Sequence, residues 1–370
     1  MKVLALVYNR PGSRISIYIE HLFAQARRTF DVRVLYRSSN NAIDTLRFVR
    51  AVLDFKPDIL YCFTPGVPVY AAMKVQKLRG GKTVLHYDDF TYLYLRDFGT
   101  NRGPANPLLL SIVRFVEHGC LRSADRLLLM NKREAYYLRQ WGVRTKTAVL
   151  PHGADLRHLR PKNVSSLRTR IGLANVMTVG MVATFNYAKR YDIFFGWDIL
   201  EAIRELSDVP VKAVFVGSGN AIDIMKERAR RYGIADKVVF VGAKHYRELT
   251  DYYNLIDVCT LAQPQHPSAE IKTPLKFPEY LACGRYVVVS STARAVTPFI
   301  RSNGGILQYR GIKDPAYPAL LAAHLRTLVR NRRLLKRGLR GRSIARRYFD
   351  YDRLAAEMTT FLKAFEASGA

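Results

Sequence analysis

The stretch TPLKFPEYLACGRYVVVS, residues 273–290, decides the class of fold. Pro278 suits the first position of a helix, where its missing N–H is not needed, and Glu279 then lies in the first turn, where the helix dipole favours an acid. Gly284 supplies a stop signal for this helix. The run Tyr286–Val289 that follows is rich in β-branched residues and is typical of a strand buried on both faces. A short helix that leads into a buried strand predicts a parallel α/β sheet.

The start of this predicted helix has two interpretations. Free N–H groups at a helix N-terminus attract anions, and Lys276 adds a positive charge just before the predicted helix. Ordinary helix capping explains the same residues equally well. The local pattern therefore does not decide between an anion site and a capped helix.

Strand and helix patterns alternate along the whole chain. In the first half the strand patterns are KVLALVY (2–8), DVRVLY (31–36), DILYCF (58–63), GKTVLHY (81–87), RLLLM (126–130) and TAVLP (147–151). The polar, proline-bounded segment 151–163 has no periodicity and is predicted to be a linker. The alternation then starts again with VMTVGMV (176–182), VKAVFVG (211–217), KVVFVG (237–242) and DVCTLA (257–262). This pattern predicts an α/β protein with two Rossmann-like halves.

The length of 370 residues also favours two domains over one. We expect an N-terminal Rossmann-like domain over residues 1–160 and a second one over residues 161–347. The segment 348–370 contains the amphipathic pattern FDYDRLAAEMTTFLKAF, which predicts a C-terminal helix. We expect that helix to cross back and pack on the N-terminal domain.

The composition indicates the cellular compartment in which the protein works. The four cysteines lie far apart without a Cys-x-x-Cys pair, which argues against a zinc or disulfide framework and fits a reduced, cytoplasmic compartment. No apolar run is long enough to span a bilayer, and the first residues read as a strand rather than a signal peptide. We expect no metal and no cofactor.

The net charge of +29 favours polyanionic partners: phosphorylated small molecules, anionic lipid surfaces or nucleic acid. Nucleic acid is disfavoured because no RNP motif, zinc finger or KH-type clamp is present. The basic segment 71–82 could lie on an anionic membrane as part of a peripheral protein at the inner face, and a solvated helix end explains it about as well.

Ligands of parallel α/β sheets bind in the loops beyond the carboxyl ends of the strands. Gly12, after the first strand, lets backbone approach a ligand closely, whereas the missing G-x-G-x-x-G there argues against a dinucleotide dehydrogenase. Lys189 and Arg190 are placed for phosphate charge, and Gly217 lies in a strand–helix turn. A plain turn or a solvated pair of cations remains the alternative at each of these places.

The cluster HYDDF (86–90) follows a strand as well. His86, Asp88 or Asp89 could act on a substrate hydroxyl or hold a metal, although no clear Asp-x-Asp metal signature is present. Capping of the next helix is the alternative. His152, in the predicted linker, would face any cleft between the two halves.

Taken together, several stretches resemble the nucleotide-sugar glycosyltransferases of the two-Rossmann (GT-B) fold, in the large retaining group called glycosyl transferases group one. The resemblance covers most of residues 140–350. The stretches that carry it are LPHGADLRHLRP (150–161), VGMVATFNYAKRYDIF (179–194), VFVGSGN (214–220), VVFVGAKHYRELTDYYNLIDVCTLA (238–262) and TPLKFPEYLACGRYVVVS (273–290). It implies two domains facing across a cleft and a retaining hexosyltransferase whose donor is a UDP- or GDP-sugar. A lipid-linked or cell-envelope glycan is the acceptor we favour.

The resemblance also implies roles for single residues. Glu279 would bind the ribose hydroxyls of the nucleotide, and Lys189 the diphosphate. Lys276 would be a second cation near the phosphates or the donor sugar. The remaining residues of the implied donor site are Gly12 and Arg190 near the phosphates, the backbone of Ala243 and Lys244 at the base, His86 or Asp88 at the donor sugar, and Gly217, Leu275 and Glu270.

Two departures from the family pattern bear on activity. The first glutamate of the usual Glu-x7-Glu pair would stand at position 271, which is Ile271, and Glu270 is one residue away. The usual arginine after the strand glycine is Met181. A catalytically weakened nucleotide-sugar-binding protein is therefore an alternative, and a nucleotide-sugar epimerase of similar architecture is another.

Overall fold

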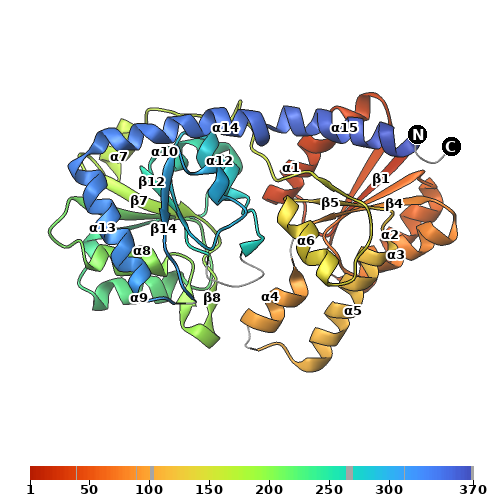
Figure 1. The fold of residues 1–370 in the computed structure, drawn as a ribbon, viewed down its shortest axis with the longest axis horizontal. Coiled ribbons are helices and arrows are strands. Elements are labelled where there is room, and N and C mark those ends of the chain that lie inside the picture. The colour runs from red at the N-terminus through yellow and green to blue at the C-terminus, as the bar shows by residue number, and fades with distance from the viewer. Residues whose placement is uncertain (39, 89, 101–103, 264–269, 312, 368–370) are drawn as a thin grey trace. The chain divides into compact units, whose positions relative to one another are not determined.

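The computed structural model describes residues 1–367, apart from 39, 89, 101–103, 264–269 and 312, and divides into two compact units (Figure 1). Unit 1 is built from Met1–Asp97, Pro104–Gly153 and the C-terminal stretch that starts at Tyr351. Unit 2 is built mainly from Ala154–Asp350. Each unit is one parallel six-stranded sheet with helices on both faces, so the predicted α/β fold with two Rossmann-like units is confirmed.

The sheet of unit 1 has the strand order β2-β1-β3-β4-β5-β6. Its strands are β1 (Lys2–Val7), β2 (Asp31–Tyr36), β3 (Ile59–Phe63), β4 (Lys82–Tyr87), β5 (Arg126–Leu129) and β6 (Thr147–Val149). Its helices are α1 (Arg14–Phe23), α2 (Asn41–Phe55), α3 (Val67–Leu78), α4 (Thr91–Phe98), α5 (Pro107–Ser123) and α6 (Lys132–Gln140). Strand order reverses between β1 and β3, which makes the carboxyl ends of those two strands the switch point of the sheet.

The sheet of unit 2 has the Rossmann order β11-β10-β7-β12-β13-β14. Its strands are β7 (Met177–Val182), β10 (Val211–Val216), β11 (Val238–Gly242), β12 (Val258–Leu261), β13 (Tyr286–Ser290) and β14 (Gly304–Leu307), with a small antiparallel hairpin of β8 (Tyr187–Ala188) and β9 (Ile193–Phe194) after β7. Its helices are α7 (Ser165–Arg170), α8 (Trp197–Arg204), α9 (Ile222–Arg231), α10 (Leu249–Asn254), α12 (Lys276–Ala282), α13 (Ala316–Arg330) and α14 (Gly341–Tyr348). The switch point lies between β7 and β12.

Strand β13 is buried on both faces, as its β-branched run predicts. Tyr286 and Val288 belong to the core that α8, α9 and α13 cover, whereas Val287 and Val289 belong to the core under α10 and α12. The period of two residues along a strand separates the two sets. This strand therefore joins the two cores of unit 2.

The helix that precedes β13 begins earlier than predicted. Helix α12 starts at Lys276, so Pro278 is its third residue rather than its first. Proline at the third position still loses no hydrogen bond, because the first four N–H groups of a helix have no partner within the helix. Glu279 remains in the first turn, and Gly284 follows the helix with a φ of 63°, as the predicted stop signal requires.

The units divide at residues 153/154 and 350/351, a few residues from the boundaries expected at 160/161 and 347/348. The N–H of Ala154 donates to the carbonyl of Phe349 at 2.7 Å, and both residues are buried in the core of unit 2. Most of the predicted linker, from Ala154 onward, thus belongs to unit 2 and contributes to its core. Because burial depends on partners almost 200 residues away, segment polarity alone missed it.

Helix α15 (Tyr351–Ala367) belongs to unit 1 and packs on α1. The ring of Tyr351 stacks on His21 with centroids 4.7 Å apart, and Gln25 donates to the carbonyl of Asp352 at 3.2 Å. Among the helices of the described residues, none is long and apolar enough to cross a lipid bilayer.

Candidate functional site

The carboxyl edge of the unit 2 sheet gathers most of the predicted site. Lys189 follows β7, Gly217 follows β10, Lys244 follows β11, and Lys276 and Glu279 follow β12 through helix α12. Because all the main strands are parallel, the loops after them lie at one edge of the sheet. The topology therefore brings these residues to the edge where α/β proteins bind ligands.

Glu279 is held in the protein by a tyrosine that the sequence interpretation did not single out. Its side chain is 1% exposed, and the hydroxyl of Tyr253 on helix α10 donates to its Oε2. The ring of Tyr253 packs edge-on against Tyr280, with centroids 5.6 Å apart. The carboxylate is therefore oriented by a buried partner from α10, the helix that precedes β12 in the chain. No local pattern in the sequence reveals that pairing.

Lys276 lies at the start of α12 with its ammonium 5.4 Å from the centroid of the Phe195 ring. Such a contact attracts the ammonium to the face of the ring and helps to hold it in place. Leu275 is the residue just before the helix, half-buried and in the right-handed helical conformation, and it provides no side-chain cap. Lys276 thus stands at the beginning of the same helix that carries Glu279.

Lys189 is exposed in a single 3-10 turn, η2 (Lys189–Tyr191), between β8 and β9. Asp192 ends this turn with a positive φ of 47° and receives three contacts. Tyr187 donates to it at 2.9 Å, Arg228 at 2.9 Å and Lys313 at 3.0 Å. This network fixes the loop that carries Lys189. The side chain of Arg190 lies outside the described residues.

The glycine turn after β10 serves close backbone packing. A Cβ on Gly217 would lie 1.9 Å from the carbonyl oxygen of Ala183, and Gly217 itself has a φ of 140°. Gly219 is confined in the same way by the carbonyl of Phe185. The turn therefore locks the loop after β7 to the loop after β10, which positions the segment that leads to Lys189.

Alanine at Gly217 is expected to lower the free energy of unfolding by about 3 kcal/mol, because the methyl group meets backbone and the backbone conformation is strained. The matched control is Gly233→Ala, where φ is 66° and no atom lies within 4 Å of the new Cβ. That control should cost only about 1 kcal/mol. Urea denaturation measures both, and equal losses would show that close packing at Gly217 is not important.

Asp198 is a fully buried acid at the start of α8 that the sequence interpretation also missed. Burial raises its pKa to about 7, against the opposing effect of backbone N–H groups at the helix start and of the Lys276 charge. Tyr309 and Tyr317 lie near enough for the Asp198 charge to raise their pKa values further, after the larger effect of burial.

The raised pKa of Asp198 predicts a pH-dependent stability. The folded protein holds the proton to higher pH than the unfolded chain, so stability should fall as pH rises from about 4 to about 7 and then level off. Asp198→Asn removes this loss, which amounts to as much as about 4 kcal/mol. Urea denaturation at pH 5 and pH 8 should show the variant gaining on the wild type at pH 8. A constant difference between the two proteins would contradict the raised pKa.

The two departures from the family pattern lie in the core. Met181 is 3% exposed and Ile271 is 1% exposed, so neither position offers a polar group to a ligand. Glu270, next to Ile271, has its Oε2 3.5 Å from the Nε of Arg294. The charge that the family pattern would place at positions 181 and 271 is therefore absent from both.

In unit 1, Gly12 lies in the loop after β1, at the switch point. Its φ is 76°, a conformation that glycine adopts without strain, and no atom lies within 4 Å of where a Cβ would stand. Ser13 then caps α1 by accepting a hydrogen bond from the N–H of Ser16 at 3.2 Å. On the other side of the switch point Thr64 follows β3 with a φ of 67°, which is strained for a β-branched residue.

His86 and Asp88, two of the alternatives that the sequence left open, differ sharply in the structure, and the third, Asp89, lies outside the described residues. His86 is fully buried, and both its ring nitrogens are engaged: Nε2 donates to the carbonyl of Leu150 at 2.9 Å, and Tyr61 donates to Nδ1 at 2.6 Å. Burial lowers the pKa of His86 to about 3, so it is neutral at physiological pH. Asp88, partly exposed at the carboxyl end of β4, accepts a hydrogen bond from Nε2 of the buried His152 at 2.7 Å. The structure thus holds His86 inside the core and Asp88, through His152, at the end of β4.

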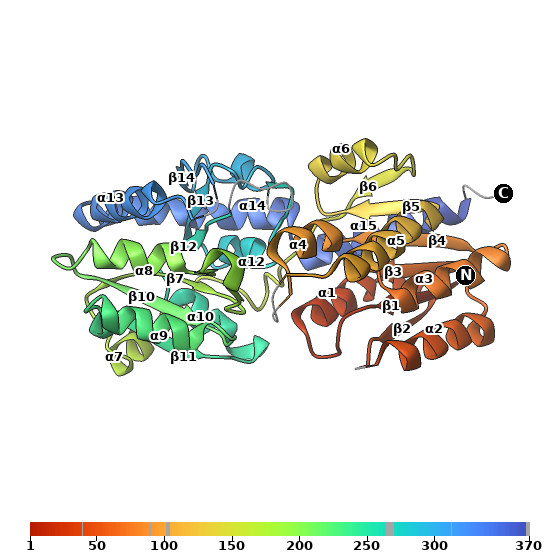
Figure 2. The same cartoon turned by 90° about the horizontal axis from the view of Figure 1, so that it is seen from below.

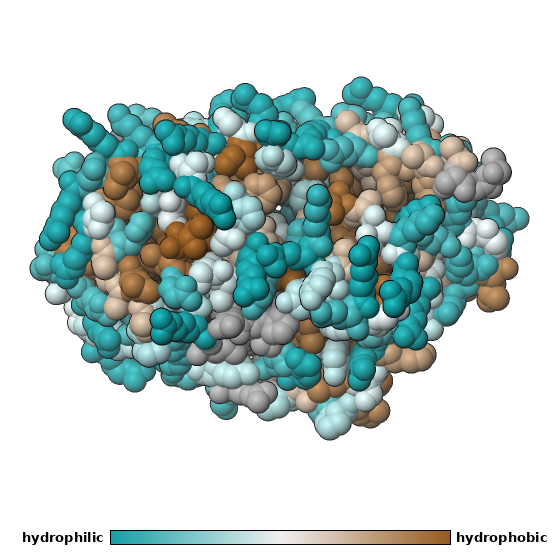
Figure 3. All heavy atoms as spheres, in the orientation of Figure 1, coloured by the Kyte–Doolittle hydropathy of each residue, from teal (hydrophilic) through white to brown (hydrophobic). Residues whose placement is uncertain are grey.

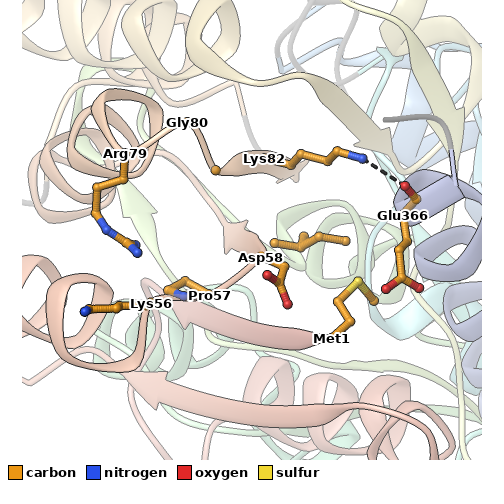
Figure 4. Close-up of a pocket in the computed structure, with 10 residues that line it drawn as sticks. Met1, Lys56, Pro57, Asp58, Arg79, Gly80, Lys82 and Glu366 are labelled. Atoms are coloured by element: carbon orange, nitrogen blue, oxygen red, sulfur yellow. Dashed lines mark hydrogen bonds between the residues drawn. The ribbon is translucent and has the colours of Figure 1, made fainter. Parts of the chain in front are cut away.

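In the part of the chain that the structure describes, neither a metal centre nor a cavity at the amino ends of the strands adds to this site. Within the described ranges, no three His, Cys, Asp or Glu side chains gather closely enough to hold a metal ion. A cavity of 330 Å³ lies at the amino ends of β1, β3 and β4, where Lys82 donates to the carbonyl of Glu366 at 3.0 Å (Figure 4). Within unit 1 this cavity is at the opposite edge of the sheet from Gly12 and Asp88, away from where such sheets bind ligands.

Family models match both units. A glycosyl transferase 4-like domain matches residues 8–153, and the family described as glycosyl transferases group 1 matches residues 175–331. These two stretches take in most of the chain. The chain belongs to the glycosyl transferases group 1 family.

Curated relatives are similar over part of their length. D-inositol 3-phosphate glycosyltransferase of Geodermatophilus obscurus is 28% identical over 238 residues, which is 60% of this chain and 50% of the relative. Alpha-monoglucosyldiacylglycerol synthase of Streptococcus pneumoniae is 24% identical over 186 residues, 48% of this chain and 40% of the relative. The chain thus matches about half, or less, of the length of these relatives.

Solved structures share the GT-B fold. Sucrose-phosphate synthase from Thermosynechococcus elongatus has a TM-score of 0.76 at 17% identity, with all of both chains covered. HepE of Anabaena in complex with UDP-glucose has a TM-score of 0.75 at 16% identity, with 98% of this chain and 100% of that chain covered. Because the sequence identities are only 16–17%, these structural similarities establish the fold of the chain and no more.

Proposed function

We propose that the protein transfers a hexose from a UDP- or GDP-sugar to a hydroxyl group with retention of the anomeric configuration. The observation that carries the proposal is the buried Glu279 carboxylate, which Tyr253 orients at the carboxyl edge of unit 2. A carboxylate fixed in this way suits the two hydroxyls of a ribose, since charged hydrogen bonds are the strong ones. The HepE structure with UDP-glucose supports a nucleotide sugar as the donor class.

Lys276 and Lys189 take up the charge that develops on the departing diphosphate in this proposal. Cations that are already in place stabilise such a charge without reorganisation during the reaction. The fixed loop around Asp192 and the start of α12 supply that placement. Because Lys276 and Lys189 balance the charge of the diphosphate, the proposed transfer needs no metal ion or cofactor. The backbone near Ala243 and Lys244 would contact the base of the nucleotide.

Asp88 is our proposed contact to a hydroxyl of the donor sugar, with His152 as the residue that positions it. A carboxylate has about four lone-pair sites, so Asp88 can accept a hydrogen bond from a sugar hydroxyl in addition to the one from His152. Gly12, at the switch point of unit 1, would allow backbone to approach the phosphates.

For the acceptor we propose a lipid-linked or cell-envelope glycan, with the protein at the cytoplasmic face of a membrane. The name of the Streptococcus pneumoniae relative, a glucosyldiacylglycerol synthase, supports a lipid-based acceptor class. The net charge of +29 supports an anionic surface as partner rather than nucleic acid, for which no binding module is present.

A second candidate function is a nucleotide-sugar-binding protein with weakened turnover. The buried, apolar side chains of Met181 and Ile271 favour it, because they replace charged groups of the family pattern. The two functions differ in product formation. Proton NMR of the wild type incubated with UDP- and GDP-hexoses should show free or transferred sugar whose first-formed anomer has the configuration of the donor. Inversion would contradict the mechanism, and a bound nucleotide without turnover would favour the binding protein.

A further inference from the structure

Helix α5 carries an apolar stripe on its solvent side. Leu108 is 72% exposed, Ile112 46% and Phe115 65%. Their spacing of four and three residues places them on one face of the helix. The opposite face, with Val116, Cys120 and Leu121, is buried in unit 1. In Figure 3, hydrophobic residues reach the surface among hydrophilic ones at the lower right, over the position of α5 in Figure 1.

A groove of 660 Å³ runs between α3 and α5, which lie side by side in Figures 1 and 2. Its lining joins cations, aromatic rings and small residues and contains no acid: Tyr70, Lys74, Lys77, Ser111, Arg114, Phe115, His118, Gly119, Arg122 and Ser123. Gly119 is required for its shape, because a Cβ there would lie 2.6 Å from the Tyr70 ring. The groove is therefore a built concave surface with one sign of charge.

Most of these cations keep their charge available. Lys77 forms an ion pair with Asp125 at 2.6 Å. Lys74, in contrast, lies 5.3 Å from the centroid of the Tyr70 ring, and Arg114 lies 5.6 Å from that of Tyr92, contacts that place a cation without neutralising it. The pKa of His118 is lowered, first by burial and then by the positive charges of Arg114 and Arg122. The second effect shows that the groove is electropositive. An anion in the groove would relieve this repulsion.

We infer that the α3–α5 face docks on an anionic lipid bilayer, with lipid phosphates in the groove and Leu108, Ile112 and Phe115 in the interface. Exposed apolar side chains beside cations are the combination that such a surface binds, whereas a nucleic-acid backbone would use the cations alone. The inference rests on the proposed function, since it gives the lipid-linked acceptor a surface.

The position of α5 supports this role. Helix α5 leads directly into β5, and a helix before a parallel strand runs opposite to it, so the N-terminal end of α5 lies toward the carboxyl edge of the unit 1 sheet. Leu108 and Ile112 are at that end. The lipid surface would therefore lie next to the edge that carries Asp88 and Gly12. The basic segment 71–82, for which the sequence left a membrane surface and a solvated helix end equally open, supplies Lys74 to this face, and the apolar part comes from α5.

Sedimentation with vesicles tests the inference. Wild type should bind vesicles of phosphatidylglycerol and phosphatidylcholine, and should bind pure phosphatidylcholine at least about 10-fold more weakly. Leu108→Ser/Ile112→Ser/Phe115→Ser should lower partitioning about 100-fold. Lys74→Gln/Arg122→Gln should lower it about 25-fold, at about 5-fold per cation. The control for the stripe is Leu46→Ser on α2, where the leucine is 73% exposed, and the control for charge is Arg144→Gln/Lys146→Gln.

Loss of binding in both groove and stripe variants, with both controls unchanged, is the expected result. Equal binding of all variants would overturn the inference, as would loss in the charge control alone, which would indicate unspecific attraction by net charge. Binding to DNA that depends on the groove, without vesicle binding, would also overturn it. Nucleotide-induced thermal shifts of the same variants should match the wild type. The proposed function has its own test in the same experiment: it is contradicted if no nucleotide shifts the melting temperature of the wild type, whatever the vesicle binding shows.

Discussion

Replacement of Glu279 by alanine is expected to weaken binding of the donor nucleotide by about 100-fold. A carboxylate that accepts two ribose hydroxyls makes two charge-assisted hydrogen bonds, each contributing about 1.5–3 kcal/mol, and part of that is recovered by water in the variant. Isothermal titration of the cognate nucleotide diphosphate measures the loss. Because the same ribose is bound before and after transfer, the KM for the donor should rise by a similar factor.

Two further variants separate the role of the carboxylate from its role in the fold. Glu279→Gln keeps an acceptor for the Tyr253 hydroxyl but lacks the charge, and we expect about a 10-fold loss of affinity. Tyr253→Phe keeps the charge and removes the orienting hydrogen bond. If Glu279→Ala binds the nucleotide as tightly as wild type while remaining folded, Glu279 is a structural residue only and the donor site lies elsewhere.

Replacement of Lys276 by alanine should lower kcat by about 100- to 1000-fold, the range found when one fixed electrostatic stabiliser of a transition state is removed. The diphosphate gains charge as the sugar leaves, so the loss should fall on kcat more than on nucleotide affinity. Steady-state release of nucleotide diphosphate from the donor measures it. Lys189→Ala should act in the same direction.

The matched control for this prediction is Lys212→Ala, a half-buried lysine on β10 that no part of the proposal uses. It should leave kcat within about 2-fold of wild type. An unchanged kcat in Lys276→Ala, combined with weaker nucleotide binding, would place Lys276 in ground-state binding and leave the departing charge to other groups.

The fold could be predicted from patterns that are local and periodic. The β-branched run in β13 and the repeated alternation of strands and helices define two parallel sheets, because a strand that packs on both faces is apolar along its whole length. The boundary between the two units was harder to predict from the sequence. Ala154 is buried through Phe349, and neither residue carries a local signal of that contact.

The site could be predicted only in part. Glu279, Lys189 and Lys276 stand in loops or at a helix start after parallel strands, so topology alone brings them to one edge. The residues that orient or surround them could not be predicted. Tyr253, Asp192 and Asp198 act through contacts across helices or through burial, which depend on three-dimensional packing. His86 illustrates the limit: it stands two residues before Asp88, but it lies within β4, which is buried from Thr83 to Tyr87, whereas Asp88 follows the strand.

The central claim is that a nucleotide diphosphate sugar binds at the carboxyl edge of unit 2, on Glu279. The most direct measurement is a thermal-shift screen of wild type and Glu279→Ala against UDP, GDP, ADP and dTDP and their common sugars. A ligand present at 100 times its Kd stabilises the folded state by about 2.7 kcal/mol, which is a readily measured shift. The account predicts that one nucleotide and its sugars raise the melting temperature of the wild type and leave that of Glu279→Ala unchanged. A wild type that responds to none of them, or a variant that responds equally, would contradict the donor site described here.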